Sequence, residues 1–357
     1  MKRKAWLALW AAVALALAGF RQAAAPAPLT PAPLLFPGEE KFLANLRQLT
    51  LGGQNAEAYW SADGRKLIFQ SDRGELPCDQ IFTMNADGSD PRRVSDGRGK
   101  TTCSYWFPSG ERILYASTFR LGPVCPPRPD RSRGYVWALD DYDLYTARSD
   151  GSDIRTLFSS PEYDAEATIS PDGRKIVFTS ARDGDLEIYA MNADGSAVTR
   201  LTRRPGYDGG PFYSADGKRI VYRADRLSSP KDLARYRENL SRRAYAPGSL
   251  EIRVMNADGS GDRAVTENGA ANFAPFFLPG GRRIIFSSNL GDPVGREFDL
   301  YIVDDDGKNL ARVTFSPEFD GFPMLSPDGS KLVFASNRNG RRPRETNIFV
   351  GDWRGPR

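Results

Sequence analysis

The sequence predicts an all-β fold, a six-bladed β-propeller whose blades are four-stranded antiparallel sheets. Three observations lead to this prediction: a turn phrase recurs six times, its spacing fits one blade per copy, and each copy contains signals for four short strands. The copies read WSADGRKLIF, WFPSGERILY, TISPDGRKIVF, YSADGKRIVY, FLPGGRRIIF and LSPDGSKLVF. Their turn glycines are Gly64, Gly110, Gly173, Gly217, Gly281 and Gly329, with spacings of 46, 63, 44, 64 and 48 residues.

The strands of each unit follow one order. A first strand enters the repeated turn, and a second strand of apolar and β-branched residues leaves it. A third strand ends in an Asp-Gly turn, as in DQIFTMNADG, DLYTARSDG, LEIYAMNADG, LEIRVMNADG and DLYIVDDDG. A short fourth strand closes the blade: RRVS, RTLF, TRLT, RAVT and ARVT.

The last blade lacks a fourth strand of its own. The chain stops after the third-strand segment TNIFVGDW, whereas the segment RQLT at residues 47–50 precedes the first blade. We expect RQLT to complete the last blade, because this closes the ring and removes an open sheet edge. The alternative is an unpaired N-terminal arm.

The N-terminus has the pattern of an export signal. Three basic residues precede an apolar run at 5–20, and Ala23-Ala24-Ala25 offers a cleavage site. We predict a signal peptide over 1–25, an Ala/Pro-rich linker over 26–43 and the propeller over 44–357. The alternative is an uncleaved anchor, although the run is short for a membrane span. The location predicted from this signal is periplasmic or secreted.

The composition narrows the function. The chain has 357 residues and no histidine, which excludes Ser-His-Asp and Cys-His nucleophiles and HExxH zinc sites. No GxSxG elbow is present. The net charge of +4 gives no reason to expect a nucleic-acid partner. The sequence therefore leans away from an enzyme.

The blade motifs resemble those of a known family. Units that end in NADGS…RLT and open with SPDG(R/K)xIVF are similar to the six-bladed propeller of TolB, over roughly residues 44–353. This resemblance implies a periplasmic binding or scaffolding protein, here a stand-alone propeller without the α/β domain that precedes the blades of TolB. It is specific for fold and much less so for function.

Polar columns appear when the blades are aligned on their turn glycines. Nine residues before the glycine stand Asn55, Thr101, Asp164, Asp208, Asn272 and Asp320, and nine after it stand Arg73, Phe119, Arg182, Arg226, Leu290 and Arg338. A ring of oxygens in the first column would suit calcium or a cationic ligand. Because each Asp is matched by an Arg, we favour cross-strand ion pairs at an exposed rim. A third column, Asp143, Glu187, Glu251 and Asp299, opens the third strands, so Arg182 could bridge Asp164 and Glu187.

Other polar and aromatic residues lack an evident partner in the sequence. Glu57 and Glu166 share a column two residues further along the first strands, and Tyr163, Tyr207 and Phe319 precede the Asp column. Acidic and aromatic residues on one face would form a platform for a peptide or sugar. Inter-blade packing is the alternative for each of them.

Two insertions, at 121–141 and 227–249, separate the second and third strands of blades two and four. The second predicts a helix, with Ser229 as cap, Pro230 at its first position, and an apolar stripe of Leu233, Tyr236 and Leu240. Its other face is basic: Lys231, Arg235, Arg237, Arg242 and Arg243. We predict that this rim is the working face, with a lid over the channel as the alternative.

Three cysteines, Cys78, Cys103 and Cys125, are expected on one sector of that rim. In an exported protein one disulfide and one free thiol follow, and Cys78–Cys125 is the favoured pair, although the sequence does not fix it.

The leading hypothesis is an exported, non-catalytic propeller that recognises an envelope protein, peptide or glycan on its loop-rich rim. We expect this propeller to be a monomer. It needs no cofactor, although calcium is possible. The alternative is a carboxylate-based, calcium-assisted lactonase or glycan-processing enzyme.

Overall fold

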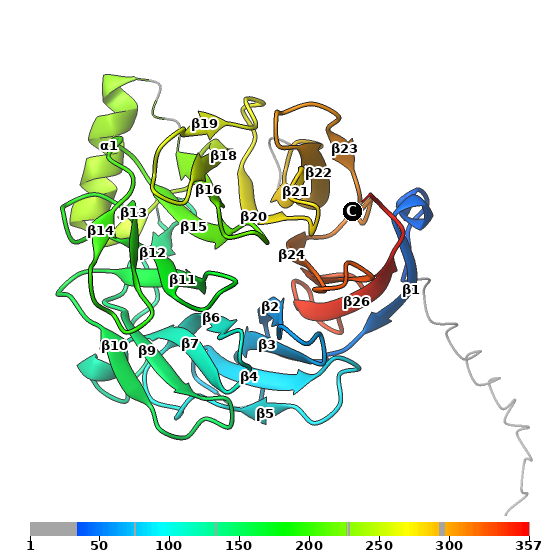
Figure 1. Ribbon diagram of the computed structural model, residues 1–357, viewed down its shortest axis with the longest axis horizontal. Helices are drawn as coiled ribbons and strands as arrows, with labels where there is room; N and C mark the ends of the chain where they lie inside the picture. Colours follow the sequence, from blue (N-terminus) through cyan, green and yellow to red (C-terminus); the bar gives the residue numbers. More distant parts are fainter. Residues whose placement is uncertain are drawn as a thin grey trace, which may run out of the picture. The chain divides into compact units, whose positions relative to one another are not determined.

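A computed structural model describes residues 34–356 apart from 75, 133, 226, 228 and 293–296. The predicted signal peptide, residues 26–33 of the predicted linker and Arg226 lie outside these residues. Six four-stranded antiparallel sheets are arranged around a central axis (Figure 1). The six-bladed propeller predicted from the repeats is therefore confirmed.

The first three blades have the predicted strand order. Blade one contains β2 (Asn55–Trp60), β3 (Lys66–Ser71), β4 (Gln80–Asn85) and β5 (Arg92–Arg93). Blade two contains β6 (Thr101–Trp106), β7 (Arg112–Ser117), β9 (Asp143–Arg148) and β10 (Arg155–Phe158). Blade three contains β11 (Asp164–Ile169), β12 (Lys175–Ser180), β13 (Glu187–Asn192) and β14 (Thr199–Arg200).

The remaining blades repeat this order. Blade four contains β15 (Asp208–Tyr213), β16 (Arg219–Asp225), β18 (Leu250–Asn256) and β19 (Arg263–Ala264). Blade five contains β20 (Asn272–Phe277), β21 (Arg283–Ser288), β22 (Asp299–Asp304) and β23 (Ala311–Arg312). Blade six contains β24 (Asp320–Leu325), β25 (Lys331–Ser336), β26 (Asn347–Trp353) and, from the N-terminal end, β1 (Leu43–Gln48).

The ring closes as the sequence predicts. Strand β1 pairs antiparallel with β26, with Leu43 opposite Trp353 and Gln48 opposite Phe349. Residues 34–42, which we expected to be the end of a linker, also contact blade six. They include the 3₁₀ helix η1 (Glu39–Lys41), and the Glu39 carboxylate is buried against the Arg338 guanidinium at 2.9 Å. The linker is therefore shorter than expected at its C-terminal end.

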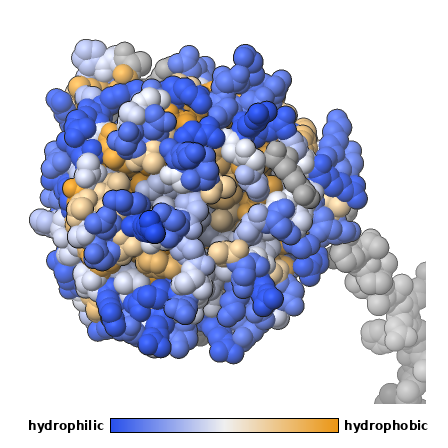
Figure 2. Space-filling model, viewed as in Figure 1, coloured by the Kyte–Doolittle hydropathy of each residue, from blue (hydrophilic) through white to orange (hydrophobic). Residues whose placement is uncertain are grey.

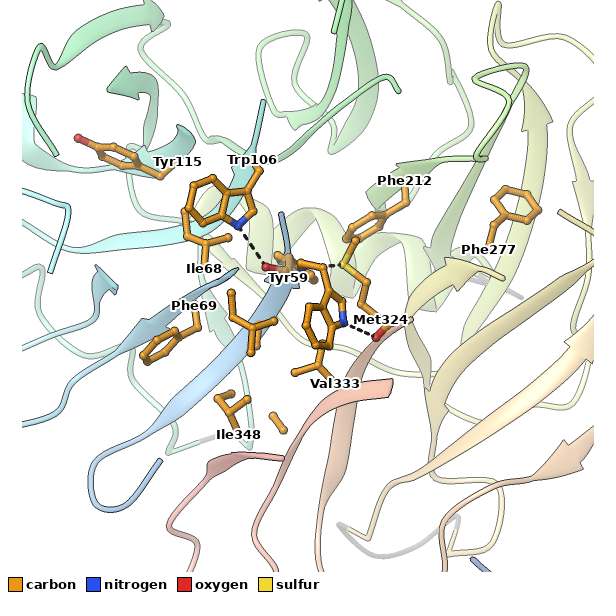
Figure 3. Close-up of a cluster of buried hydrophobic side chains, with 14 of the residues drawn as sticks. Tyr59, Ile68, Phe69, Trp106, Tyr115, Phe212, Phe277, Met324, Val333 and Ile348 are labelled. Atoms are coloured by element: carbon orange, nitrogen blue, oxygen red, sulfur yellow. Dashed lines mark hydrogen bonds between the residues drawn. The ribbon is translucent and has the colours of Figure 1, made fainter. Parts of the chain in front are cut away.

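The apolar core lies between neighbouring blades. The second strands supply fully buried side chains such as Ile68, Phe178 and Phe286. Two tryptophans also link blades by hydrogen bonds, since the Trp106 indole donates to the Tyr59 carbonyl oxygen at 3.3 Å and the Trp60 indole donates to that of Met324 at 3.2 Å (Figure 3). Hydrophilic side chains dominate the outer ring of the face in Figure 2, and hydrophobic ones are visible in the recesses between them.

The two insertions form a cap that joins blades two and four. Strand β8 (Trp137–Ala138) of the first insertion pairs with β17 (Ala244–Tyr245) of the second. The second also contains α1 (Pro230–Ser241), where the Ser229 hydroxyl accepts a hydrogen bond from the Asp232 amide at 3.2 Å. Helix α1 lies at the edge of the ring near blade three (Figure 1), and its Tyr236 hydroxyl donates to the Asp185 carboxylate at 2.5 Å. The predicted helix and its cap are confirmed, and of its apolar stripe Tyr236 is buried while Leu233 and Leu240 are half-buried.

Candidate functional site in the central channel

Every innermost strand contains a β-bulge at the same position, seven residues before its turn glycine. The strand registers shift there, for example between Ala56 and Tyr59 in blade one and between Ala165 and Thr168 in blade three. The bulge residues all have left-handed backbones, with φ between 48° and 59°: Glu57, Cys103, Glu166, Gly210, Ala274 and Phe322. Five of the six are not glycine, and this conformation is unfavourable for them. Bulges of this kind re-aim side chains beside functional sites.

An aromatic layer fills the channel two residues further along the same strands. Tyr59, Tyr105, Phe212 and Phe276 form a chain of ring contacts with centroids 5.5 to 5.9 Å apart. Tyr59, Phe212 and Met324 converge from three blades in Figure 3. Since the strands run from the insertion rim toward the repeated turns, this layer lies below the bulge ring and forms a floor.

A cavity of about 40 Å³ lies between the bulge ring and this floor. All six bulge residues line it, together with Tyr59, Ser104, Phe212 and Arg223. Such a volume has room for roughly three water-sized groups. The channel is therefore a small blind pocket that combines two carboxyls, a thiol, a hydroxyl and a guanidinium with aromatic walls.

Glu166 joins blades three and four through both of its carboxylate oxygens. It accepts hydrogen bonds from the Tyr207 hydroxyl at 2.8 Å and the Gly210 amide at 2.8 Å, and it forms an ion pair with Arg223. The Thr179 hydroxyl also donates to it at 2.7 Å. Glycine is required nearby, because a Cβ on Gly209 would stand 2.4 Å from the Tyr207 oxygen. The interpretation of Glu166 as a residue without a partner is therefore wrong.

Glu57 is the second carboxyl of the pocket, and no described cation forms an ion pair with it. Burial, with a smaller contribution from the negative charge of Glu166, raises the pKa of Glu57 to about 7, although Arg223 and a hydrogen bond with Cys103 act in the opposite direction. Asp79 adds a smaller repulsion. Because Arg223 is engaged by Glu166 and Tyr207, the ionised pocket carries one surplus negative charge.

Ser104 adds an unused hydrogen-bonding group to the same wall. Its side chain is 2% exposed, and its hydroxyl oxygen has no partner among the residues that the structure describes. A buried hydroxyl without a partner costs free energy, which a ligand could recover.

The cap packs beside this pocket. Trp137 of β8 and Tyr245 of β17 contact Tyr207, with ring centroids 5.9 and 4.6 Å apart. The Arg223 guanidinium lies 5.1 Å from the Trp137 ring. The pocket residues of blade four are thus directly supported by both insertions.

The predicted aromatic platform is not exposed. Tyr163 is 9% and Tyr207 1% exposed, and both pack in the cluster under the cap. Phe319 contacts Phe273 and Phe322 in blades five and six. These residues serve as inter-blade packing, the alternative that the sequence left open.

The Asp–Arg columns behave differently from blade to blade. Asp320 and Arg338 form an ion pair of 2.6 Å, but it is buried, not at an exposed rim. Arg182 instead lies over the Phe158 ring at 4.3 Å, and Asp164 accepts from the Ser160 hydroxyl at 2.6 Å. The register is the same in both blades, because the bulge places Ser180 opposite Asp164 and Ser336 opposite Asp320. The difference is that the Phe158 and Tyr189 rings hold the Arg182 guanidinium in blade three. The partner expected for Asp208 is Arg226, which lies outside the described residues.

The third acidic column is paired with other arginines. Glu187 binds Arg200 at 2.6 Å, so the predicted bridge from Arg182 is wrong. Asp143 binds Arg120 and Asp299 binds Arg312, each at 2.6 Å. The described residues contain no group of three or more His, Cys, Asp and Glu side chains placed to hold a metal.

The cysteines separate into two environments. Cys78 and Cys125 are joined by a disulfide, which ties the loops of blades one and two together. Cys103 is free and lies in the bulge ring of the channel, not on the rim as expected. Burial raises its thiol pKa well above the usual value.

The basic residues in and directly after α1 differ in how closely they are paired. Arg243 pairs with Asp141, and Arg242 pairs with Glu238 at 2.7 Å. Arg235 and Arg237 remain exposed, although Arg235 lies 3.8 Å from Asp232. The charge available to a partner is therefore smaller than the sequence suggested.

Sequence reasoning missed Arg223 and Ser104. Arg223 stands six residues after its turn glycine, where the other blades have Gln70, Ala116, Thr179, Ser287 and Ala335. A lone arginine in that otherwise uncharged column was a signal for a special role. Ser104 carried no such signal.

The repeated sequence matches a known family model. The model described as the TolB beta propeller domain matches residues 129–239. In this part the chain is similar to the propeller of TolB. A TolB protein structure from Agrobacterium tumefaciens aligns with 85% of the TolB-like propeller and 91% of its own chain, with a TM-score of 0.55 and 21% identity. An oligogalacturonate lyase with manganese covers 86% and 93%, with a TM-score of 0.53 and 12% identity. At these identities the structural likeness concerns the fold.

Curated relatives match only parts of the TolB-like propeller. An uncharacterised peptidase, YuxL, of Bacillus subtilis is 28% identical over 144 residues, which are 36% of this chain and 22% of that protein. A TolB homologue of Chlorobium luteolum is 26% identical over 167 residues, 40% of this chain and 36% of that protein. The match thus spans about a fifth to about a third of these relatives. Among the described residues, no helix is long and apolar enough to cross a membrane.

Proposed function

We propose that this TolB-like propeller is an exported, non-catalytic binding protein that recognises a segment of an envelope protein or peptide on its insertion rim. The observation that carries this proposal is the β8–β17 pairing, which joins two long insertions into one cap beside the channel pocket. Function in propellers concentrates on loops held by a rigid scaffold. The repeated turns that the structure describes on the opposite rim are short and contain no long insertion.

The first insertion presents apolar side chains to solvent. Val124 is 79%, Leu121 57% and Tyr135 54% exposed, and large exposed apolar groups are typical of protein-binding surfaces. Arg235 and Arg237 add exposed positive charge from the second insertion. Apolar contacts with a few guanidinium groups suit a peptide or protein with acidic residues.

A periplasmic or secreted location is consistent with this proposal. The N-terminal sequence has the pattern of an export signal, and the Cys78–Cys125 disulfide is of the kind that persists in oxidising compartments. The TolB likeness supports a scaffold role in the envelope.

An enzyme that uses carboxylates is the second candidate, favoured by the raised pKa of Glu57. A glycan-processing pair requires one acid and a second carboxylate that is free to act as base or nucleophile. The oxygens of Glu166 are held by Arg223, Tyr207, Thr179 and a backbone amide. The geometry therefore favours binding over this chemistry.

Photo-cross-linking from the two rims tests the proposal. A photoreactive phenylalanine analogue replaces Val124 on the insertion rim, and in a second variant it replaces Ala215, which is exposed on the opposite rim. After irradiation of cells that export the protein, we expect a discrete adduct from position 124 and none from position 215.

The position 215 variant is a demanding control. Ala215 lines a groove of about 570 Å³ between the turns of blades three and four, which is a hollow that could also receive a partner. Asp172 and Asp216 of that groove already accept hydrogen bonds within their own turns. An adduct at 215 alone would place the working face on the opposite rim and contradict the proposal.

A further inference from the structure

The channel pocket has a charge that its own residues do not balance. The Arg223 guanidinium is shared between Glu166 and the Tyr207 hydroxyl, which its Nε contacts at 2.9 Å. Glu57 faces Cys103, Glu166 and Arg223 across the ring and has no described ion-pair partner. Burial removes the hydrating water from this carboxylate, and a nearby cation would stabilise its charged form in place of that water.

The pocket wall also contains a buried hydroxyl group that could bind a ligand. The Ser104 hydroxyl lines the cavity, is buried, and finds no partner among the described residues. An ammonium group has three donors, so it could serve a carboxylate and a hydroxyl oxygen at once. An anion would meet two carboxyls here and is excluded by repulsion.

Shape and walls restrict the cation further. The aromatic layer closes the channel below, so a ligand must enter end first from the insertion rim. The volume of about 40 Å³ accepts an ammonium and one or two methylene groups but leaves little room for a planar guanidinium. Tyr59, Phe212 and Phe322 give apolar walls that suit methylene groups and ring faces that attract a cation.

We propose that this pocket binds a primary ammonium group, supplied by a lysine side chain of the recognised segment that enters the channel from the insertion rim. Glu57 takes the charge, Ser104 accepts a hydrogen bond, and the Glu166–Arg223–Tyr207 group holds the wall of blade four in place. The lysine part of this inference rests on the proposed function, whereas the ammonium site itself does not.

Titration calorimetry with n-butylammonium as the probe tests the site on the whole purified protein. We expect n-butylammonium to bind and n-butanol, its neutral analogue of similar shape, not to bind. Because Glu57 ionises near pH 7 and the amine stays protonated, affinity should rise about tenfold or more between pH 5.5 and pH 8. The Glu57→Gln variant should lose binding and its pH dependence, and Ser104→Ala should weaken binding several-fold.

Two further measurements make the result decisive. Glu111→Gln removes an exposed carboxylate at a repeated turn and should bind like the parent protein. Cys103, the one cysteine outside the disulfide, should react more slowly with methyl methanethiosulfonate when n-butylammonium is bound. Equal binding of n-butanol, unchanged binding by Glu57→Gln, or unprotected Cys103 would each overturn the ammonium site.

The outcome is separable from that of the proposed function. Adducts from position 124 without amine binding would remove the ammonium site and leave the binding rim. Amine binding without adducts from position 124 would leave a small-amine site and contradict the protein-binding role.

Discussion

Removal of residues up to Leu51 is expected to make the protein aggregate or to lower its melting temperature by on the order of 10 °C or more. The deletion removes β1 and so exposes the edge of β26, an apolar strand whose residues 348–350 are fully buried. It also removes Glu39, which leaves Arg338 with one carboxylate fewer in a buried site. Thermal unfolding and size-exclusion chromatography measure the effect.

A shorter deletion provides the matched control. A variant that starts at Leu34 keeps η1, β1 and the Glu39–Arg338 contact, so its melting temperature should equal that of the longer chain. If the deletion through Leu51 unfolded at the same temperature as this control, closure of the ring by β1 would contribute nothing to stability.

The second large effect is expected at the buried group of Glu39, Arg338 and Asp320. Arg338 is 3% exposed and forms ion pairs of 2.9 and 2.6 Å with Glu39 and Asp320. Arg338→Met leaves two buried carboxylates without their cation, so we expect a loss of about 3–5 kcal/mol in the free energy of unfolding. Chemical denaturation measures this loss, and Asp320→Asn in the same chain should restore part of it.

Blade three offers a matched comparison at the same column positions. Arg182 lies over aromatic rings and acts on Asp164 through its charge without a direct ion pair, so a double-mutant cycle of Arg182→Met with Asp164→Asn should give a coupling energy well below that of the Arg338–Asp320 pair. The Arg338–Asp320 cycle should give about 1 kcal/mol or more. Equal coupling energies in the two blades would contradict the difference in Asp–Arg pairing between them.

The fold was predictable because each blade repeats its own signals. Six turn glycines, the third-strand Asp-Gly turns and the RQLT segment determine the number of blades and the closure, all of which are local or periodic features. Helix α1 was predictable for the same reason, since its cap, Pro230 and Tyr236 lie within one short stretch.

The site was only partly predictable, because no shared residue type marks the position of the bulges in the repeated sequence. The spacing of Asp164 and Arg182 about the turn suggests a facing pair, but the bulge places Ser180 opposite Asp164, and aromatic rings hold the Arg182 guanidinium. The same bulges turn Glu57, Cys103 and Glu166 into the channel. The pairing of Glu166 with Arg223 crosses between blades, and no periodicity within one chain reports such a contact.

The central claim is that one ligand occupies both the insertion rim and the channel pocket. The most direct test is the yield of the adduct from the photoreactive residue at position 124, compared between the parent sequence, Glu57→Gln and Glu111→Gln. If the rim and the pocket bind the same segment, Glu57→Gln should lower the yield several-fold, because the inserted ammonium loses its carboxylate, and Glu111→Gln should leave it unchanged. An equal yield in all three proteins would show that the insertion rim and the channel pocket do not bind the same segment.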